Sequence, residues 1–318
     1  MKAAIYSENG GPEVFRLVDL PDPEPGPGEV LVRIEAISIE GGDLLARRSS
    51  PPADPPRVKG YAAAGRIAAM PPGVSSLAVG DAVTTFAFEG SHAELRVVPA
   101  VQCWAVPTGV AMADAAAMLI SFGTAALALR LAGFQPGQSV LVTGATGGVG
   151  LATVQLAART GATVLGSASN PRALEGLRRF GLDHALDVNV GPLNEQVRGA
   201  LGHGVDCVID NVGGRAVSEG IAALDDGGTL ALVGILDPDI QRINPVTLLL
   251  RRLTVTGCFL GPIIARPDVS AMIAELLADV ATGGLEIPLA ATFPLQEVVA
   301  AHRQAEQRGR FGRVVMTV

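Results

Sequence analysis

A glycine-rich segment between an apolar run and a helical pattern limits the fold of this chain more than any other feature. The sequence there reads Val140-Leu-Val-Thr-Gly-Ala-Thr-Gly-Gly-Val-Gly-Leu-Ala. Ala145, Gly147 and Gly150 stand at the G-x-G-x-x-G spacing, with alanine in the first position. A dinucleotide-binding turn needs small residues at these places, because the backbone turns tightly, approaches a pyrophosphate and packs a helix against a strand. We therefore expect a dinucleotide site here; the alternative is a tight turn that binds no ligand.

Apolar strands and amphipathic helices alternate after Gln138. The pattern predicts strands at 139–143, 163–168, 205–210 and 228–233, and helices at 148–160, 171–180 and 214–224. Further strands are expected at 253–259 and 313–318, with helices at 111–131 and 268–281. Such alternation is typical of a parallel sheet covered on both faces. The first 105 residues are predicted to be β-structure, with strands at 30–35, 63–69, 81–88 and 93–98.

The charge of the chain excludes several classes of partner. Its 24 Lys and Arg against 31 Asp and Glu give a net charge of −7, so nucleic acid and anionic membrane surfaces are not expected to bind. The first residues lack the apolar core of a secretory signal, and no uninterrupted apolar run is long enough to span a bilayer. We expect a soluble, cytoplasmic protein without nucleic-acid or membrane partners.

The end of the second predicted strand indicates which cofactor binds. Sites that prefer NAD place Asp or Glu there, where it binds the ribose 2′-hydroxyl. This chain has Gly166-Ser-Ala-Ser-Asn-Pro-Arg, without a carboxylate. Ser167, Ser169 and Arg172 are instead predicted to bind a 2′-phosphate, which favours NADPH. The alternative for Arg172 is a solvated side chain in the first turn of a helix.

Other candidate cofactor residues follow predicted strands, at the edge where ligands of open α/β sheets bind. Asn211 is placed to reach the nicotinamide or its ribose, although ordinary βα turns also favour asparagine and glycine. The turn residues predicted to bind the cofactor are Thr143, Gly144, Ala145, Gly147, Gly148, Val149, Asn211, Gly234 and Ile235.

Short segments in a fixed order along nearly the whole chain resemble a known family. Besides the glycine-rich turn they are Met1-Lys-Ala-Ala-Ile, Gly28-Glu-Val-Leu-Val-Arg, Gly80-Asp-Ala-Val, Ala93-Glu-Leu, Ala115-Ala-Ala-Met, Gly123-Thr-Ala, Gly204-Val-Asp-Cys-Val-Ile-Asp, Gly227-Gly-Thr-Leu and Gly312-Arg-Val-Val. In this order they are similar to the zinc-independent quinone oxidoreductases of the medium-chain dehydrogenase/reductase superfamily.

The resemblance implies an α/β fold of two domains. A GroES-like, partly open β-barrel domain is expected from residues 1–120 and 262–318, with a Rossmann domain, a doubly wound parallel sheet, at 121–261. The resemblance also implies NADPH as cofactor and a homodimer joined through edge strands near Thr254–Phe259. Family positions beside the cofactor are occupied here by Thr124, Phe259, Leu260 and Arg313.

Zinc ligands are missing where zinc-dependent relatives carry them. The segments Ile39-Glu-Gly-Gly-Asp and Gly60-Tyr-Ala-Ala-Ala-Gly contain no Cys or His, and the three cysteines of the chain are far apart. We therefore expect no metal site and no metal-assisted hydride transfer.

Without a metal, hydrogen-bond donors, cofactor hydroxyls or water must stabilise the negative charge that develops on a substrate oxygen. Tyr61 is the candidate side-chain donor; the alternative is a tyrosine packed beneath the barrel. Glu40, which stands where the family usually has asparagine, is the second catalytic candidate and is expected near the nicotinamide. Asp43 is expected to be structural and to pair with Arg47.

The four histidines are not expected to form a functional group. His92 is predicted to line the mouth of a cleft. His184 and His302 are predicted to lie at the surface, and His203 in a loop flanked by glycine.

The expected function is an NADPH-dependent reductase that acts on a small molecule, a quinone or an α,β-unsaturated carbonyl compound. One alternative is an enoyl-thioester reductase. Another is an NADPH-binding sensor that has lost turnover, an idea motivated by Glu40 in the place of asparagine.

Overall fold

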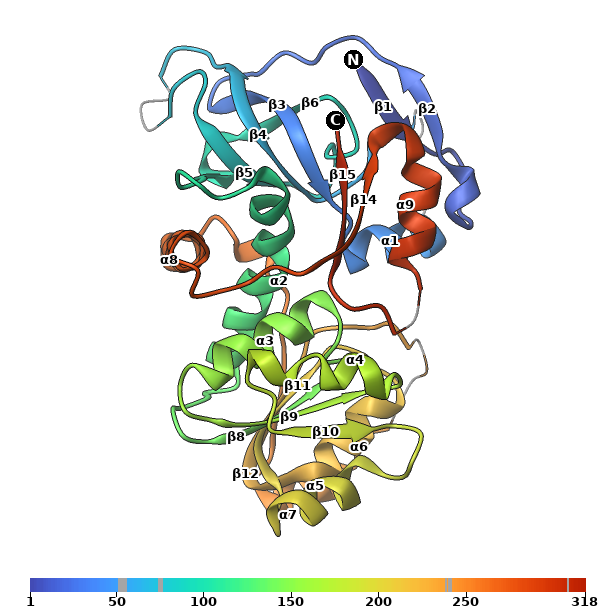
Figure 1. The fold of residues 1–318 in the computed structure, drawn as a ribbon, viewed down its shortest axis with the longest axis vertical. Coiled ribbons are helices and arrows are strands. Elements are labelled where there is room, and N and C mark those ends of the chain that lie inside the picture. The colour runs from blue at the N-terminus through green and yellow to red at the C-terminus, as the bar shows by residue number, and fades with distance from the viewer. Residues whose placement is uncertain (51–55, 74–76, 238, 240–241, 308) are drawn as a thin grey trace. The chain divides into compact units, whose positions relative to one another are not determined.

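The structure, a computed structural model, describes residues 1–50, 56–73, 77–237, 239, 242–307 and 309–318. The chain forms two compact units, whose elements are labelled in Figure 1. Unit 1 comprises Met1–Ile120, Gly261–Gln307 and Arg313–Val318, and unit 2 comprises Ser121–Leu260 and Arg308–Gly312. The chain therefore leaves unit 1 for unit 2 and later returns.

A seven-stranded sheet forms the centre of unit 1. Its order is β14-β15-β3-β4-β5-β7, with β6 paired to β3. In β3, Val30, Val32 and Ile34 are buried and alternate with more exposed neighbours, as in a strand with one face on a core. The strands are β3 (Glu29–Ser38), β4 (Ala62–Ala69), β5 (Ala82–Phe86), β6 (Leu95–Pro99), β7 (Cys103–Ala105), β14 (Leu289–Pro294) and β15 (Arg313–Thr317).

A small hairpin and several helices pack around this sheet. The hairpin consists of β1 (Lys2–Ile5) and β2 (Arg16–Asp19), and the helices are α1 (Gly41–Ser49), α8 (Pro267–Ala281) and α9 (Val298–Ala305). Short 3₁₀ turns lie at Pro12–Val14, Ala100–Gln102, Gly261–Ile263 and Leu295–Glu297. One hydrophobic core joins the segment after the hairpin's first strand to β3, α9 and β15; it includes Tyr6, Phe15, Ile37, Leu295 and Met316.

The prediction of β-structure for the first 105 residues is wrong at α1. Two glycines open this helix, and glycine disfavours helix formation locally. The helix forms because Asp43 Oδ2 accepts a hydrogen bond from the Glu40 N–H at 2.8 Å, and because Leu44 packs against the core of unit 1. Tertiary contacts therefore override a weak local preference.

The long Ala/Leu-rich helix predicted from the sequence is α2 (Met112–Leu131), which belongs to unit 1 up to Ile120 and to unit 2 from Ser121. Within the described residues, α2 alone is long and apolar enough to cross a membrane by length and composition. Its most apolar window is 72% buried within the protein, as in the core helix of a folded domain. The helix is therefore weak evidence for a membrane span.

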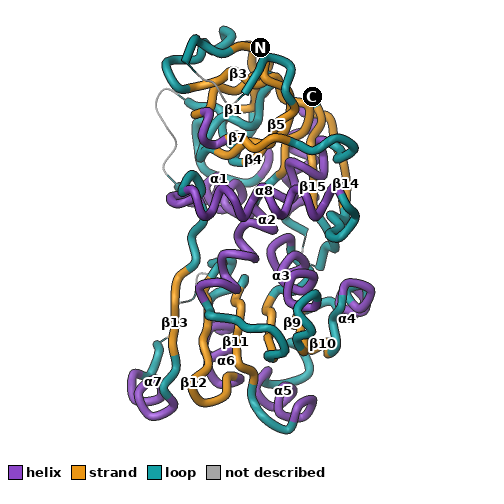
Figure 2. Tube along the Cα trace, turned by 90° about the vertical axis from the view of Figure 1, so that its left-hand side faces the viewer, coloured by secondary structure: helices purple, strands orange, loops and turns teal. Residues whose placement is uncertain are grey.

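Unit 2 is built on a six-stranded parallel sheet of order β10-β9-β8-β11-β12-β13. The strands lie side by side, with β10 and β13 at the two edges (Figure 2). Every residue of β8 is buried, so the sheet is covered on both faces there. In chain order this arrangement is 3-2-1-4-5-6, the doubly wound order of a Rossmann sheet, as predicted. The strands are β8 (Ser139–Thr143), β9 (Thr163–Ala168), β10 (His184–Asp187), β11 (Val205–Asp210), β12 (Leu224–Leu232) and β13 (Thr254–Gly257).

The helices of unit 2 agree with the sequence less closely than its strands. The helix predicted at 171–180 is α4 (Pro171–Glu175) followed by a 3₁₀ turn at Arg178–Phe180, because Gly176 ends the α-helix. Helices α3 (Gly148–Ala158) and α6 (Arg215–Ala223) lie where the pattern predicts them. Helices α5 (Leu193–Leu201) and α7 (Pro245–Arg251) have no counterpart among the predicted elements.

Candidate functional site

The turn between β8 and α3 has the geometry of a dinucleotide-binding turn. Gly144 adopts a left-handed φ of +58°, and the Ala145 N–H donates to the Ser167 carbonyl of β9 at 3.0 Å. A Cβ on Gly150 would lie 2.4 Å from the Gly144 carbonyl oxygen, so the start of α3 touches the turn backbone. The first helical N–H groups, at Gly148 and Val149, have no acceptor within the helix and are available to an anion.

Two buried polar atoms at the carboxyl edge of the sheet fit a bound cofactor. Among the residues that the structure describes, no group hydrogen-bonds the Ser167 hydroxyl at the end of β9 or Asn211 Oδ1 after β11. Asn211 Nδ2 donates to the Thr143 carbonyl at 2.9 Å, which fixes the orientation of this amide. Buried polar atoms are nearly always paired, so these two atoms suit ligand groups placed over the glycine turn.

Asp210 accepts the hydrogen bonds that hold this edge of the sheet together, and the sequence analysis did not predict this role. Its buried carboxylate accepts hydrogen bonds from the Thr143 hydroxyl, from the Gly213 N–H at 2.9 Å and from the Val212 N–H at 3.4 Å. Burial raises the pKa of Asp210, while these three hydrogen bonds oppose the shift. Because the Asn211 N–H donates to the same Thr143 hydroxyl at 3.1 Å, Asp210 holds two predicted cofactor residues in place. An acid at the end of an apolar strand is the sequence signal for it.

Of the residues predicted to bind a 2′-phosphate, Ser167 lies in β9, and Ser169 and Arg172 follow this strand. Ser169 and Arg172 are exposed, and Asn170 caps α4 by accepting from the Arg172 N–H at 3.1 Å. The turn after β12 packs closely against the turn after β11: a Cβ on Gly234 would lie 2.1 Å from the Asn211 carbonyl oxygen. Ile235, next to it, is exposed.

Three further candidates come together elsewhere in unit 2. Thr124 is buried in α2, and its carbonyl oxygen accepts from the Cys258 thiol at 3.8 Å. Cys258 directly precedes the other two candidates, the exposed Phe259 and the buried Leu260.

Arg313, a predicted cofactor residue, lies in unit 1, where it pairs with the catalytic candidate Glu40. Its Nη2 is 2.5 Å from Glu40 Oε1 and donates to the Ser38 hydroxyl at 2.9 Å and to the Ile39 carbonyl at 2.7 Å. Both side chains are buried. The guanidinium therefore ties the start of β15 to the segment that leads into α1.

A cavity of about 280 Å³ in unit 1 contains the predicted catalytic tyrosine. Tyr61 lies in it with its ring edge-on to Phe86 and Phe88, at centroid distances of 6.1 and 5.8 Å. A Cβ on Gly42 would lie 2.3 Å from the Tyr61 ring, so this glycine makes room for the tyrosine. The cavity is lined by Tyr6, Asp43, Ala46, Ser50, Lys59, Gly60, Tyr61, Phe88 and Glu89.

Tyr61 and Asp43, two of the acids in this cavity wall, are held in their protonated forms near neutral pH. Burial raises the pKa of Tyr61 to about 12, and the nearby Asp43 adds to the shift. Burial raises the pKa of Asp43 to about 8, although the hydrogen bond from the Glu40 N–H opposes this. Over the part of the chain described, Asp43 Oδ1 has no hydrogen-bond partner. The expected pairing of Asp43 with Arg47 is wrong, because Arg47 turns to Glu306 instead.

No group of three His, Cys, Asp or Glu side chains within the described ranges is placed to hold a metal ion. Cys103, Cys207 and Cys258 are free thiols, and burial raises the pKa of each.

The predictions of a cleft-mouth position for His92 and a surface position for His302 are wrong. Both side chains are fully buried, and their Nε2 atoms lie 2.9 Å apart. Burial and the charge of Arg96 lower the pKa of His92 to about 3. Burial, His92 and Arg47 lower the pKa of His302 well below its usual value. The fold joins residues 210 positions apart, which no local pattern reveals.

This pair makes the stability of the protein sensitive to acid. Both imidazoles are neutral in the native state, whereas in the unfolded state they bind protons near pH 6.5, so stability falls as the pH falls below that value. Replacing His302 by glutamine should lower the slope of the unfolding free energy between pH 6 and 5 by about 1.4 kcal/mol per pH unit. Urea titrations at several pH values measure this slope. An unchanged slope in His302→Gln would contradict the prediction.

Comparisons with known proteins show the family to which the chain belongs. A family model described as an alcohol dehydrogenase GroES-like domain matches residues 26–108, and one described as a zinc-binding dehydrogenase matches 148–278. A 2-haloacrylate reductase from Burkholderia is 30% identical over 326 residues, which cover 99% of this chain and 98% of that protein. The chain belongs to the quinone oxidoreductase-like group of the medium-chain dehydrogenase/reductase superfamily, and is an oxidoreductase of that superfamily.

Two solved structures show the same fold over the whole chain. A mycobacterial protein in complex with NADPH is 30% identical, with a TM-score of 0.93 and 100% coverage of both chains. The Escherichia coli quinone oxidoreductase in complex with NADPH is 25% identical, also with a TM-score of 0.93 and 100% coverage of both chains. The predicted combination of a GroES-like and a Rossmann fold is confirmed.

Proposed function

We propose that this protein is an NADPH-dependent reductase of quinones or α,β-unsaturated carbonyl compounds. The observation that carries the cofactor is the glycine turn of unit 2 with the buried, unpaired Ser167 hydroxyl and Asn211 amide oxygen beside it. The NADPH held by two of the related structures supports it. A haloacrylate has a carbon–carbon double bond conjugated to a carboxylate, so the Burkholderia relative supports an activated alkene as one acceptor class.

The acceptor is assigned to the cavity of unit 1. Bound NADPH supplies a hydride, and a proton completes the reduction of the acceptor. Tyr61 keeps its phenolic proton because burial raises its pKa to about 12, so it can donate a hydrogen bond to an acceptor oxygen on which charge develops. The protonated Asp43 in the same cavity wall can deliver a proton. Glu40 is assigned a supporting role, because its carboxylate is paired with Arg313.

Steady-state oxidation of NADPH with 1,4-benzoquinone, 9,10-phenanthrenequinone and a short enone tests this function. Tyr61→Phe should lower kcat on the order of 100-fold, as loss of a donor to a developing oxyanion does. Tyr6→Phe, in the same cavity, is the matched control and should retain activity. Tight NADPH binding without turnover of any acceptor would favour the sensor alternative, and turnover of an enoyl thioester alone would favour the thioester reductase.

The 2′-phosphate assignment predicts a charge-specific effect at Arg172. Arg172→Asp should weaken NADPH binding by at least tenfold and leave NADH binding nearly unchanged, because a charged hydrogen bond to phosphate contributes about 1.5–3 kcal/mol. Titrations of both cofactors followed by fluorescence give the two dissociation constants. Arg198→Asp in α5 makes the same change of charge at another exposed site and is the control. Equal losses for NADPH and NADH in Arg172→Asp would overturn the assignment.

We also propose a homodimer formed through unit 2. The strand β13 is an edge of the six-stranded sheet, and α7, which leads into it, exposes Val246, Leu249 and Leu250. An open strand edge beside exposed apolar side chains is suited to a second copy of the chain. Sedimentation velocity at micromolar concentration tests this, and a monomer under those conditions would contradict it.

A further inference from the structure

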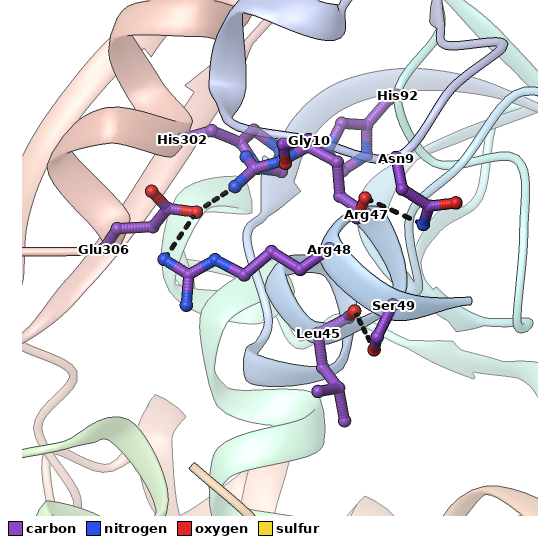
Figure 3. Close-up of polar contacts among 9 residues, drawn as sticks. All are labelled: Asn9, Gly10, Leu45, Arg47, Arg48, Ser49, His92, His302 and Glu306. Atoms are coloured by element: carbon purple, nitrogen blue, oxygen red, sulfur yellow. Dashed lines mark hydrogen bonds and ion pairs between the residues drawn. The ribbon is translucent and has the colours of Figure 1, made fainter. Parts of the chain in front are cut away.

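A buried chain of polar contacts in unit 1 runs from the end of α9 to the wall of the cavity. Glu306, the residue that follows α9, forms ion pairs with Arg47 and, at 3.1 Å, with Arg48, and Figure 3 shows its carboxylate bridging the two guanidinium groups. Arg47 Nη1 lies 3.4 Å from His302 Nδ1, and His302 Nε2 lies 2.9 Å from His92 Nε2. The chain ends where His92 Nδ1 meets the Ser91 hydroxyl at 3.0 Å.

The hydrogen bonds in this series of contacts are all donated in one direction, from Arg47 towards Ser91. A guanidinium only donates, so His302 Nδ1 must accept from Arg47 and the proton of the neutral ring lies on Nε2. His302 therefore donates to His92 Nε2, which leaves the His92 proton on Nδ1, directed at the Ser91 hydroxyl. The sequence of contacts thus fixes the tautomer of both rings.

Packing and further hydrogen bonds leave these side chains little freedom. Phe15 stacks on the His92 ring at a centroid distance of 5.9 Å and lies 4.5 Å from the His302 ring. Arg47 Nε donates to the Gly10 carbonyl at 3.2 Å, and the Asn9 amide donates to the Arg47 carbonyl at 3.1 Å. The arginine is therefore held from the N-terminal segment as well as from α9.

The far end of the chain supports the residues that line the cavity. The backbone N–H of His92 donates to the Lys59 carbonyl at 2.9 Å, and the backbone N–H of Ser91 donates to the Gly60 carbonyl at 3.2 Å. Gly60 has a φ of +102°, and a Cβ there would lie 1.9 Å from His92 Nδ1. The backbone that leads into Tyr61 therefore rests directly on the His92 ring. On its other side, the Tyr61 ring meets Gly42 of α1, the helix that carries Arg47.

We propose that Arg47 and His302 are positioning residues that act through His92 on Gly60 and so set the position of Tyr61 in the cavity. The catalytic consequence of this coupling rests on the proposed function of Tyr61, whereas the coupling itself does not. Loss of the contacts at His302 should let the segment 59–61 shift. Glutamine at 302 can still accept from Arg47 and donate to His92, so it should preserve the arrangement.

The two tyrosines of the chain allow a direct test. Protein labelled with 3-fluorotyrosine should give two ¹⁹F resonances, and Tyr6→Phe identifies that of Tyr61. His302→Leu should shift or broaden the Tyr61 resonance, and His302→Gln should leave it at its wild-type position. Val298→Ala, a matched control on the same helix, removes buried methyl groups but alters none of the polar contacts described above. The proposal is overturned if the Tyr61 resonance is unchanged in His302→Leu, or moves equally in Val298→Ala.

Two further measurements test the proposal if His302→Leu does not fold, or if the wild-type protein turns over no acceptor. In ¹⁵N-histidine spectra of the wild-type protein, His302 should carry its proton on Nε2 and His92 on Nδ1; the reverse pair of tautomers overturns the proposal. If wild-type turnover is present, His302→Leu should lower kcat between about 10- and 100-fold, since displacement of a reacting group by 1 Å has effects of this size. If wild-type turnover is absent, the proposed function fails and the ¹⁹F result alone decides the coupling.

Discussion

Replacing Gly150 by alanine is expected to weaken NADPH binding by more than tenfold and to lower the free energy of unfolding by about 1–3 kcal/mol, as overpacking does. The new Cβ would lie 2.4 Å from the Gly144 carbonyl oxygen and 2.7 Å from Ala145 Cα. Both contacts are backbone, so α3 must move away from the turn whose N–H groups are assigned to the pyrophosphate. Fluorescence titration with NADPH and urea denaturation measure the two effects.

A second helical glycine provides the control. Gly199 lies in α5, and an added Cβ there would meet nothing within 4 Å. Gly199→Ala should therefore raise the free energy of unfolding by about 0.4–1 kcal/mol, because alanine loses less backbone freedom on folding, and NADPH binding should not change. Unaltered NADPH affinity in Gly150→Ala would contradict the role of the turn.

Replacing Asp210 by alanine should raise the dissociation constant of NADPH on the order of tenfold and destabilise the fold. The change leaves the Thr143 hydroxyl and the N–H groups of Val212 and Gly213 without their acceptor, at about 1–3 kcal/mol for each donor left buried and unpaired. It also frees Thr143 and Asn211 from their fixed positions. Loss of a single hydrogen bond to the cofactor, at about 1.4 kcal/mol, already gives a factor of ten.

The opposite ends of the same two strands contain the matched control. Asp206 of β11 accepts from the Ser139 N–H and the Ser139 hydroxyl of β8, each at 2.8 Å, as Asp210 accepts from Thr143. Asp206→Ala should therefore destabilise the protein without changing its affinity for NADPH. A similar loss of affinity in both variants would show that Asp210 acts through general stability, and would refute its specific role at the cofactor edge.

Much of unit 2, though not β10, α5 or α7, could be predicted from the sequence, because the patterns that indicate its elements are local. The strands of the βα units are short apolar runs, and the bounds of β8, β9 and β11 can be read from them directly. Gly144 is required by a left-handed φ and Gly150 by a close contact within one turn, so the glycine pattern together with the strand before it and the helix after it predicts the site. Asp210 was missed because an acid beside Asn-Val-Gly-Gly is equally typical of an ordinary turn.

The polar interior of unit 1 could not be predicted in the same way. Arg47, His92 and His302 come together from three distant parts of the sequence, and each stands in a segment that resembles a surface. The helix α1 opens with two glycines and forms through its capping contacts and core packing. Glu40 pairs with Arg313, although the sequence analysis assigned Glu40 to catalysis and Arg313 to cofactor binding.

The position of β15 has a consequence for the order in which the protein folds during synthesis. This strand lies between β14 and β3 in the sheet of unit 1, although it is translated after all of unit 2. On the ribosome, the parallel sheet of unit 2 is complete while the N-terminal sheet still lacks β14 and β15, and domains generally fold as units as they emerge. Until β15 arrives, the Ala36–Ser38 end of β3 keeps an open edge, so a chain that ends before Arg313 should be a better chaperone substrate than the full chain.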